Sequence, residues 1–156
     1  MKTLRILLAL LSPLLLLLPV AYAAPTSASG SFTVSNSPPT VRTAGGNMIL
    51  TYDGSFTSTG TFVGTCSGQE VTVLHPDGTA NTRATCTFTG TVGDKSGTLM
   101  FLTVAQGQGS SFHGHFTLLA GGTGGLASLR GEGSFSGTAT GPLTSAGTYT
   151  GHINFR

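Results

Sequence analysis

Apolar residues alternate with polar residues along most of this 156-residue chain, and this period of two is the feature that most restricts its fold. In residues 83–92, for example, Ala84, Cys86, Phe88 and Val92 fall on one face, with an arginine and several threonines on the other. A strand places successive side chains on opposite faces, whereas a helix buries residues three or four apart. The pattern therefore predicts an all-β protein with half-buried strands and no long helix.

About eight such segments follow one another and are joined by short turn sequences. HPDG (75–78) has the proline and glycine of a type I turn, and GDKSG (93–97) is another tight reversal. Consecutive strands with short links are typical of an antiparallel meander, and closing the sheet removes its edges. We therefore expect an eight-stranded antiparallel barrel. Residues 35–46 are the best candidate for a mobile loop, and residues 96–105, apolar on both faces, predict a strand covered on both sides.

The N-terminus has the features of a secretory signal peptide. Lys2 and Arg5 precede an apolar stretch at residues 6–18, and the sequence AYA places small residues before a cleavage site. We expect cleavage after Ala23, which leaves one secreted or periplasmic domain, residues 24–156, with no membrane contact. This domain has five basic and five acidic residues. Its near-zero net charge argues against nucleic acid as a partner.

The two cysteines, Cys66 and Cys86, are expected to form a disulfide, as paired cysteines in exported proteins commonly do. A hairpin that turns at Pro76 and Asp77 places them nearly opposite each other, one bulge from the ideal register, on the apolar faces of their strands. A reactive thiol is the rival interpretation, since GTCSG resembles a nucleophile elbow. That elbow requires a strand-to-helix turn, and no helix is predicted here. Two buried thiols are the remaining alternative.

The stretch GGTGGLASLRGEG (121–133) contains the G-x-G-x-x-A spacing of dinucleotide-binding loops. That motif needs a βαβ unit and an acid about 20 residues further on, and Glu132, the only later acid, comes too soon. The Gly-Lys-Ser/Thr of a Walker-type loop is also missing. We interpret the stretch as architectural, with a glycine-rich link, a helical turn at Leu126–Leu129 and a strand from Gly131. No cofactor is predicted.

Three longer segments carry a family resemblance: TFTGTVGDKSGTLMF, GGTGGLASLRGEGSF and GTYTGHINF. They resemble an uncharacterised bacterial family, a domain of unknown function with the allene oxide cyclase-like barrel. The resemblance runs from about Ser27 to Phe155 and is strongest after Phe88, and the glycine stretch is its most specific part. It implies the calycin-like, eight-stranded antiparallel barrel of allene oxide cyclases and dirigent proteins. It implies no activity and transfers no catalytic residue.

Several charged and histidine side chains are candidates for a polar site on the outer face. His113 and His115 lie two apart on one strand, and His152 and Glu132 lie on the polar faces of neighbouring strands. A meander could bring them together as a weak metal site. Solvated side chains outside the barrel are the plainer interpretation, and no metal is predicted. Arg130 and Glu132 are expected to form an ion pair at the rim, worth about 0 to 1 kcal/mol.

Three functions are compatible with such a barrel. The favoured one is binding of a small apolar molecule inside it, with Tyr52 or Tyr149 supplying a polar contact. The alternatives are a cyclase- or isomerase-type enzyme, which a cluster of inward-facing polar groups would favour, and a structural or surface-interaction protein with a filled barrel. No nucleophile–base pair is recognisable, so catalysis is the less favoured function, and no catalytic residue or oligomeric state is predicted. The residues expected to line the interior are Leu50, Tyr52, Phe62, Phe88, Phe112, Phe116 and Phe135.

Overall fold

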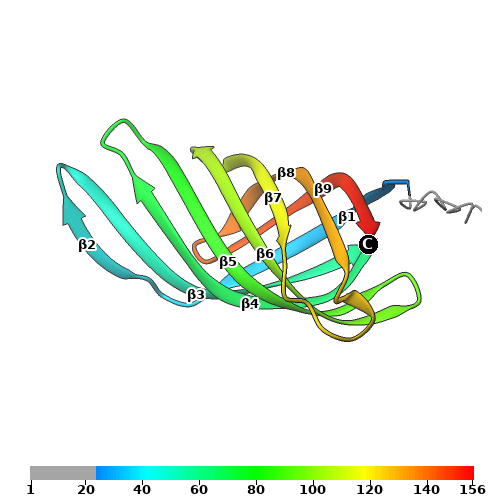
Figure 1. The fold of residues 1–156 in the computed structure, drawn as a ribbon. Helices are drawn as coiled ribbons and strands as arrows, with labels where there is room; N and C mark the ends of the chain where they lie inside the picture. Colours follow the sequence, from blue (N-terminus) through cyan, green and yellow to red (C-terminus); the bar gives the residue numbers. More distant parts are fainter. Residues whose placement is uncertain (1–23) are drawn as a thin grey trace, which may run out of the picture.

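The computed structural model describes residues 24–156, which form a barrel of antiparallel strands (Figure 1). The predicted signal peptide, residues 1–23, lies outside the described residues. No helix in the described part is long and apolar enough to cross a membrane. The strands are β1 (Thr26–Asn36), β2 (Thr40–Ala44), β3 (Asn47–Gly60), β4 (Phe62–Leu74), β5 (Thr79–Val92), β6 (Lys95–Gln108), β7 (Ser111–Leu119), β8 (Leu129–Gly141) and β9 (Thr144–Phe155), with a short 3-10 helix, η1 (Gly124–Leu126), after β7.

The barrel closes because β1 pairs with both β9 and β3. Eight strands, β1 and β3 to β9, therefore form the predicted barrel, with every neighbouring pair antiparallel. The ninth strand, β2, pairs with residues 47–51 of β3, whereas β1 pairs with residues 54–60. The β2–β3 hairpin thus extends beyond the closed barrel (Figure 1). The prediction of a mobile loop at residues 35–46 was wrong, because the end of β1 and all of β2 lie in it.

Large inward-facing rings lie directly opposite glycines of the neighbouring strand. In five such pairs, a Cβ added to the glycine would come within 2.7 Å of a ring atom. The rings therefore occupy the space that a side chain on the next strand would need, which explains the frequent glycines within the strands. The pairs are Phe32–Gly147, Phe112–Gly137, Phe116–Gly133, Phe135–Gly114 and Tyr149–Gly30.

The glycine stretch covers one end of the barrel. Leu126 and Leu129 are fully buried in the main core cluster. The glycines allow the link to lie against the start of β6, since a Cβ on Gly122 would meet the Thr98 carbonyl oxygen at 2.7 Å. The stretch is architectural in this structure. The local boundaries differ from the prediction, because η1 ends at Leu126 and β8 begins at Leu129, two residues before Gly131.

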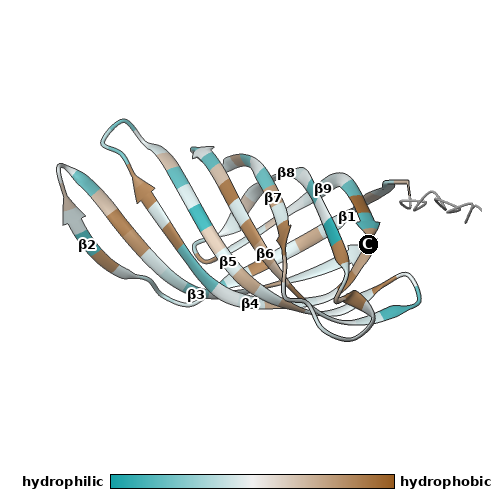
Figure 2. Cartoon of the chain, viewed as in Figure 1, coloured by the Kyte–Doolittle hydropathy of each residue, from teal (hydrophilic) through white to brown (hydrophobic). Residues whose placement is uncertain are grey.

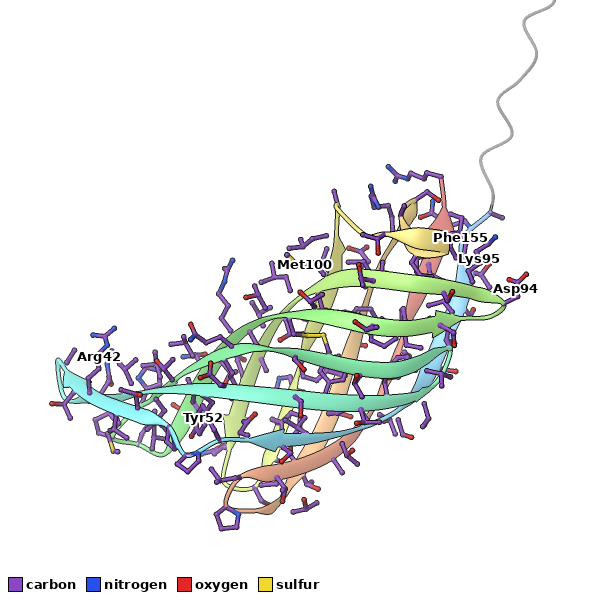
Figure 3. The ribbon with its side chains drawn as sticks, turned by 90° about the horizontal axis from the view of Figure 1, so that it is seen from below. Arg42, Tyr52, Asp94, Lys95, Met100 and Phe155 are labelled. Atoms are coloured by element: carbon purple, nitrogen blue, oxygen red, sulfur yellow. A yellow bond between two sulfur atoms is a disulfide. The ribbon has the colours of Figure 1, made fainter. Side chains whose placement is uncertain are left out.

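The outer face of β6 is uncovered, contrary to the prediction that this strand is covered on both sides. Met100 is 43% exposed and Val104 is 45% exposed, while Leu99 and Phe101 on the opposite face are buried. Figure 2 shows apolar segments along β6 and β3, and Figure 3 shows Met100 on the outside of the sheet. The apolar outer residues of β6 therefore lie on the surface of this chain.

Candidate functional site

The barrel encloses a cavity of about 420 Å³. All eight barrel strands contribute to its wall, and it reaches the barrel end that holds the β4–β5 and β6–β7 turns, where Gly78 and Gly109 lie at its edge. The other end is filled by buried side chains, including Leu99, Leu126 and Leu129. The interior is therefore filled at one end and hollow at the other.

The floor of the cavity is a cluster of aromatic rings. The ring centroids of Phe62 and Phe101 are 5.3 Å apart, and those of Phe101 and Phe116 are 5.8 Å apart. Tyr149 belongs to the same cluster, 5.6 Å from Phe62. Its hydroxyl accepts a hydrogen bond from the Phe62 N–H and donates one to the Thr59 carbonyl, both at 2.9 Å. These backbone bonds use the only proton of the hydroxyl, so Tyr149 has no donor left for a ligand, and its contact with one stays a prediction.

The disulfide lies in the cavity wall, across β4 and β5. Cys66 and Cys86 are joined, as the sequence predicted, with a Cα–Cα distance of 5.7 Å. The register needs no bulge: Cys66 lies opposite Phe88, and Gly68 lies opposite Cys86. The bridge is thus diagonal, and a Cβ at Gly68 would lie 2.6 Å from the Cβ of Cys86. Gly68 therefore leaves the room that the diagonal bridge needs.

A cluster of polar side chains lies on the inner faces of β1, β3, β4 and β5. Glu70 is directly opposite Tyr52 in the sheet. The Thr72 hydroxyl donates a hydrogen bond to Glu70 Oε1 at 3.1 Å, and it lies 2.8 Å from the Thr82 hydroxyl. Asn36 comes from the end of β1, opposite a glycine that leaves room for its amide. All five side chains line the cavity.

The surroundings shift the pKa of both ionisable groups of this cluster. Burial raises the pKa of the Glu70 carboxyl, and hydrogen bonds from Thr72 and Asn36 partly offset this effect. Burial also raises the pKa of the Tyr52 phenol, and the negative charge of Glu70 adds to that shift. Tyr52 therefore stays protonated at neutral pH.

The raised pKa of Glu70 determines how this residue makes the stability of the protein depend on pH. The folded chain holds this proton more tightly than the unfolded chain does. The stabilising contribution is therefore present below the ordinary carboxyl pKa, and it is lost as the pH rises through the folded-state pKa. Above that pKa the ionised carboxylate is a cost to folding.

Ser58 adds a second polar group deeper in the cavity. Its side chain is 3% exposed, and its hydroxyl has no hydrogen-bond partner among the described residues. It lies on the same face of β3 as Tyr52, six residues away, and it lines the cavity. An unpaired buried hydroxyl costs about 1 to 3 kcal/mol, which a ligand or a water molecule with a hydrogen bond would offset.

Five of the seven residues predicted to line the interior lie in the cavity wall, and two do not. Leu50 belongs to the part of β3 that pairs with β2, outside the β1–β3 closure, and Phe88 is fully buried in the filled core. Contact of any of these residues with a ligand stays a prediction. The five in the wall are Tyr52, Phe62, Phe112, Phe116 and Phe135.

Strands β7 and β9, which carry these histidines, lie on either side of β8, which carries Glu132, as expected from the meander. Glu132 of β8 is directly opposite His152 of β9. His115 of β7 is opposite Ser134 of β8, which is the next residue after Glu132 on the same face of that strand. No group of three potential metal ligands comes together within residues 24–156. The side chains of His113, His115 and His152 are exposed on the outer surface.

The predicted ion pair between Arg130 and Glu132 does not form in the described part of the chain. Arg130 Nη1 instead donates to the carbonyl oxygens of Leu129, at 2.7 Å, and of Ala127, at 3.3 Å. These carbonyl oxygens lie just after η1 and at the start of β8, within reach of the guanidinium. Arg130 therefore has a local structural role.

Fold and cavity together define a small antiparallel β-barrel with a hollow, largely apolar interior. In a comparison with models of protein families, residues 28–149 match the model described as "Protein of unknown function (DUF3224)". The chain belongs to this family, as its sequence segments predicted. No curated protein matches. A relation to allene oxide cyclases or dirigent proteins is not shown and stays a prediction.

Two solved structures have the same fold. A protein of unknown function from the DUF3224 family of Shewanella oneidensis MR-1 is 18% identical, with a TM-score of 0.67, covering 85% of this chain and 98% of its own. A protein of unknown function from Clostridium acetobutylicum ATCC 824 is 9% identical, with a TM-score of 0.57, covering 83% of this chain and 98% of its own. These likenesses show the fold alone.

Proposed function

We propose that this protein is exported and holds a small, largely apolar molecule inside its barrel. The observation that carries the proposal is the 420 Å³ cavity with an aromatic floor and a polar cluster on one wall. Such a combination of apolar surface and a few placed polar groups is typical of small-molecule sites. The disulfide is compatible with an oxidising compartment, as the predicted signal peptide requires.

Burial of apolar surface supplies a large part of the free energy of binding that such a ligand needs, but not all of it. A ligand that buries about 300 Å² of its surface gains about 7 kcal/mol at roughly 25 cal/mol per Å². A micromolar complex needs about 8 kcal/mol in net terms. The aromatic contacts and one or two hydrogen bonds must therefore offset the cost of association.

Blocking the cavity is expected to abolish binding. Ala84 lines the cavity on β5, so Ala84→Phe fills the space with a ring. Octanol binding, measured by calorimetry, should fall at least tenfold from its wild-type value, while the melting temperature stays close to that of the parent. Thr87→Phe is the matched control, because Thr87 is exposed on the same strand and does not line the cavity. Equal octanol affinity in Ala84→Phe and in the parent would contradict a cavity site.

Removal of the Ser58 hydroxyl tests whether this buried group is unpaired in the folded protein. Ser58→Ala deletes a buried hydroxyl with no partner in the described residues, so we expect the free energy of unfolding to stay equal or to rise by about 1 kcal/mol. Urea unfolding measures this change. A loss of more than about 1 kcal/mol would show that the hydroxyl has a partner in the folded protein, such as an ordered water.

An isomerase- or cyclase-type enzyme is the second candidate function. The observation that favours it is the inward-facing polar cluster, where Glu70 with a raised pKa could move a proton on a bound substrate. Native mass spectrometry of the purified protein would identify a co-purified molecule. Incubating that molecule with the parent and with Glu70→Gln then decides between the functions: a product formed only by the parent supports the enzyme, and recovery of the unchanged molecule supports binding.

A further inference from the structure

The cavity contains one acidic side chain and no basic one. Glu70 is the only acid among the residues that line it, and these residues include no lysine, arginine or histidine. A carboxylate taken out of water without a cation pays a desolvation cost, and a paired charge would offset this cost. When Glu70 is ionised, the cavity therefore holds a negative charge in an apolar space without supplying the counter-charge.

Neighbouring side chains fix this carboxylate rather than neutralise it. The Thr72 hydroxyl donates a hydrogen bond to Glu70 Oε1, and the Thr82 hydroxyl lies within hydrogen-bond distance of the Thr72 hydroxyl. Asn36 reaches the same group from β1, and Gly54 leaves the space for its amide, because a Cβ there would lie 3.1 Å from Asn36 Cγ. A carboxylate has about four acceptor positions, so it retains capacity to accept from a ligand.

Two aromatic side chains of β3 line the cavity beside the carboxylate and towards the floor. Tyr52 lies opposite Glu70, and Phe56 follows on the same face of β3 and also lines the cavity. Ring faces attract cations, most strongly where water is excluded. Figure 3 places Tyr52 between the barrel body and the β2–β3 extension that carries Arg42, on the side of the open end. The polar cluster therefore lies towards the open end and the apolar floor lies deeper.

We propose that the ligand is a lipophilic amine, a molecule with one protonated amino group and an apolar body. The ammonium group lies against the Glu70 carboxylate beside Tyr52, and the apolar body extends to the rings of Phe62, Phe101 and Phe116. This inference rests on the proposed function, since it names the ligand class of the same cavity. It adds that the ligand carries a positive charge, and that its charged end lies at Glu70 with its apolar end at the aromatic floor.

The test compares three probes of equal chain length: octylamine, octanol and octanoate. Calorimetry of the parent protein should show octylamine binding at least tenfold tighter than octanol, with octanoate the weakest, because a hydrogen bond to a charged partner is worth about that factor. In Glu70→Gln the advantage of octylamine should disappear, while octanol affinity stays within twofold. Glu132→Gln is the control, because it removes an exposed acid on the outer face and should leave all three affinities unchanged.

The dependence on pH gives a second readout. Tyr52 on β3 is the other titratable side chain that faces Glu70. The facing residues of β5 and β1 that line the cavity there, Thr82, Ala84 and Asn36, do not titrate in this range. Octylamine binding to the parent should therefore weaken as the pH falls through the raised pKa of Glu70, and octanol binding should not change over this range. Glu70→Gln should lose this dependence.

The outcomes separate the inference from the function on which it rests. Failure of all three probes to bind would overturn the proposed function. Octanol binding as tight as octylamine in the parent would overturn the amine inference and keep the cavity as a site. An equal loss of octanol and octylamine in Glu70→Gln would also overturn it, because the carboxylate would then serve as an acceptor for neutral donors. Glu70→Gln is expected to fold, since glutamine has the same size and shape and carries no charge that would have to be buried.

Discussion

Gly133→Ala is expected to destabilise the protein by about 3 kcal/mol, the upper end of the usual cost of overpacking, although it adds a single methyl group. Gly133 lies on β8 opposite Phe116, whose ring covers the position of the missing side chain. An added Cβ would lie 2.5 Å from Phe116 Cε1, and closer still to the Thr150 carbonyl oxygen of β9. Both neighbours are fixed: the ring is part of the core, and the carbonyl belongs to the sheet. The measurement is urea unfolding, with far-UV circular dichroism if the variant fails to fold.

Gly107→Ala is the matched control for this effect. Gly107 also lies on a barrel strand, but the nearest atom to its added Cβ, the Ser111 carbonyl oxygen, is 3.4 Å away. The same chemical change should therefore alter the free energy of unfolding by less than about 1 kcal/mol, with a gain possible from the stiffer unfolded chain. Equal effects of the two substitutions would show that glycine flexibility, rather than ring packing, explains these positions.

The period of two was enough to predict the barrel, because each barrel strand has one face buried in a shared interior. It was not enough for β2, every residue of which is exposed. A strand without a buried face shows no alternation, and its two flanking prolines and two glycines resemble a loop. Its pairing with β3 could be seen only once the register of the long hairpins was known.

The sequence could predict which residues face inward, but not which of them line the cavity. Leu50 and Phe88 have the correct parity for the inner face of β3 and β5, yet neither lines the cavity. Leu50 lies beyond the point where β1 closes the barrel, and Phe88 lies where neighbouring rings fill the space. The position of closure and the sum of side-chain volumes depend on several strands at once, so no single segment reveals them.

Glu70 was missed although the sequence contained the signal. Cys66 faces inward on β4, and counting on in steps of two reaches Gly68 and then Glu70. A charged residue is usually assigned to the solvent side, since burial of an unpaired charge is costly. A break in the polar–apolar alternation, with an acid on the inner face, is therefore a useful indication of a binding site in a barrel sequence.

Reduction of the Cys66–Cys86 disulfide is expected to lower the free energy of unfolding by about 3 kcal/mol. The bridge closes a loop across 20 residues, and a loop of this length restricts the unfolded chain by about that amount. The effect should be read from urea unfolding of the same protein with and without reductant, so that no side chain is changed. Labelling of the denatured, unreduced protein should first find no free thiol. Two labelled cysteines per chain would contradict the bridge.

The disulfide also bears on the cavity, and a binding measurement tests this link. Both cysteines line the cavity, and Glu70 lies four residues after Cys66 on the same face of β4. The bridge fixes β4 against β5, but the backbone ladder between these strands runs from Phe62–Val92 to Leu74–Ala80 and does not depend on it. We therefore expect the reduced protein, kept well below its unfolding transition, to bind octanol within about threefold of the oxidised protein. A complete loss of binding at a urea concentration where the reduced chain is still folded would mean that the disulfide positions the cavity wall itself.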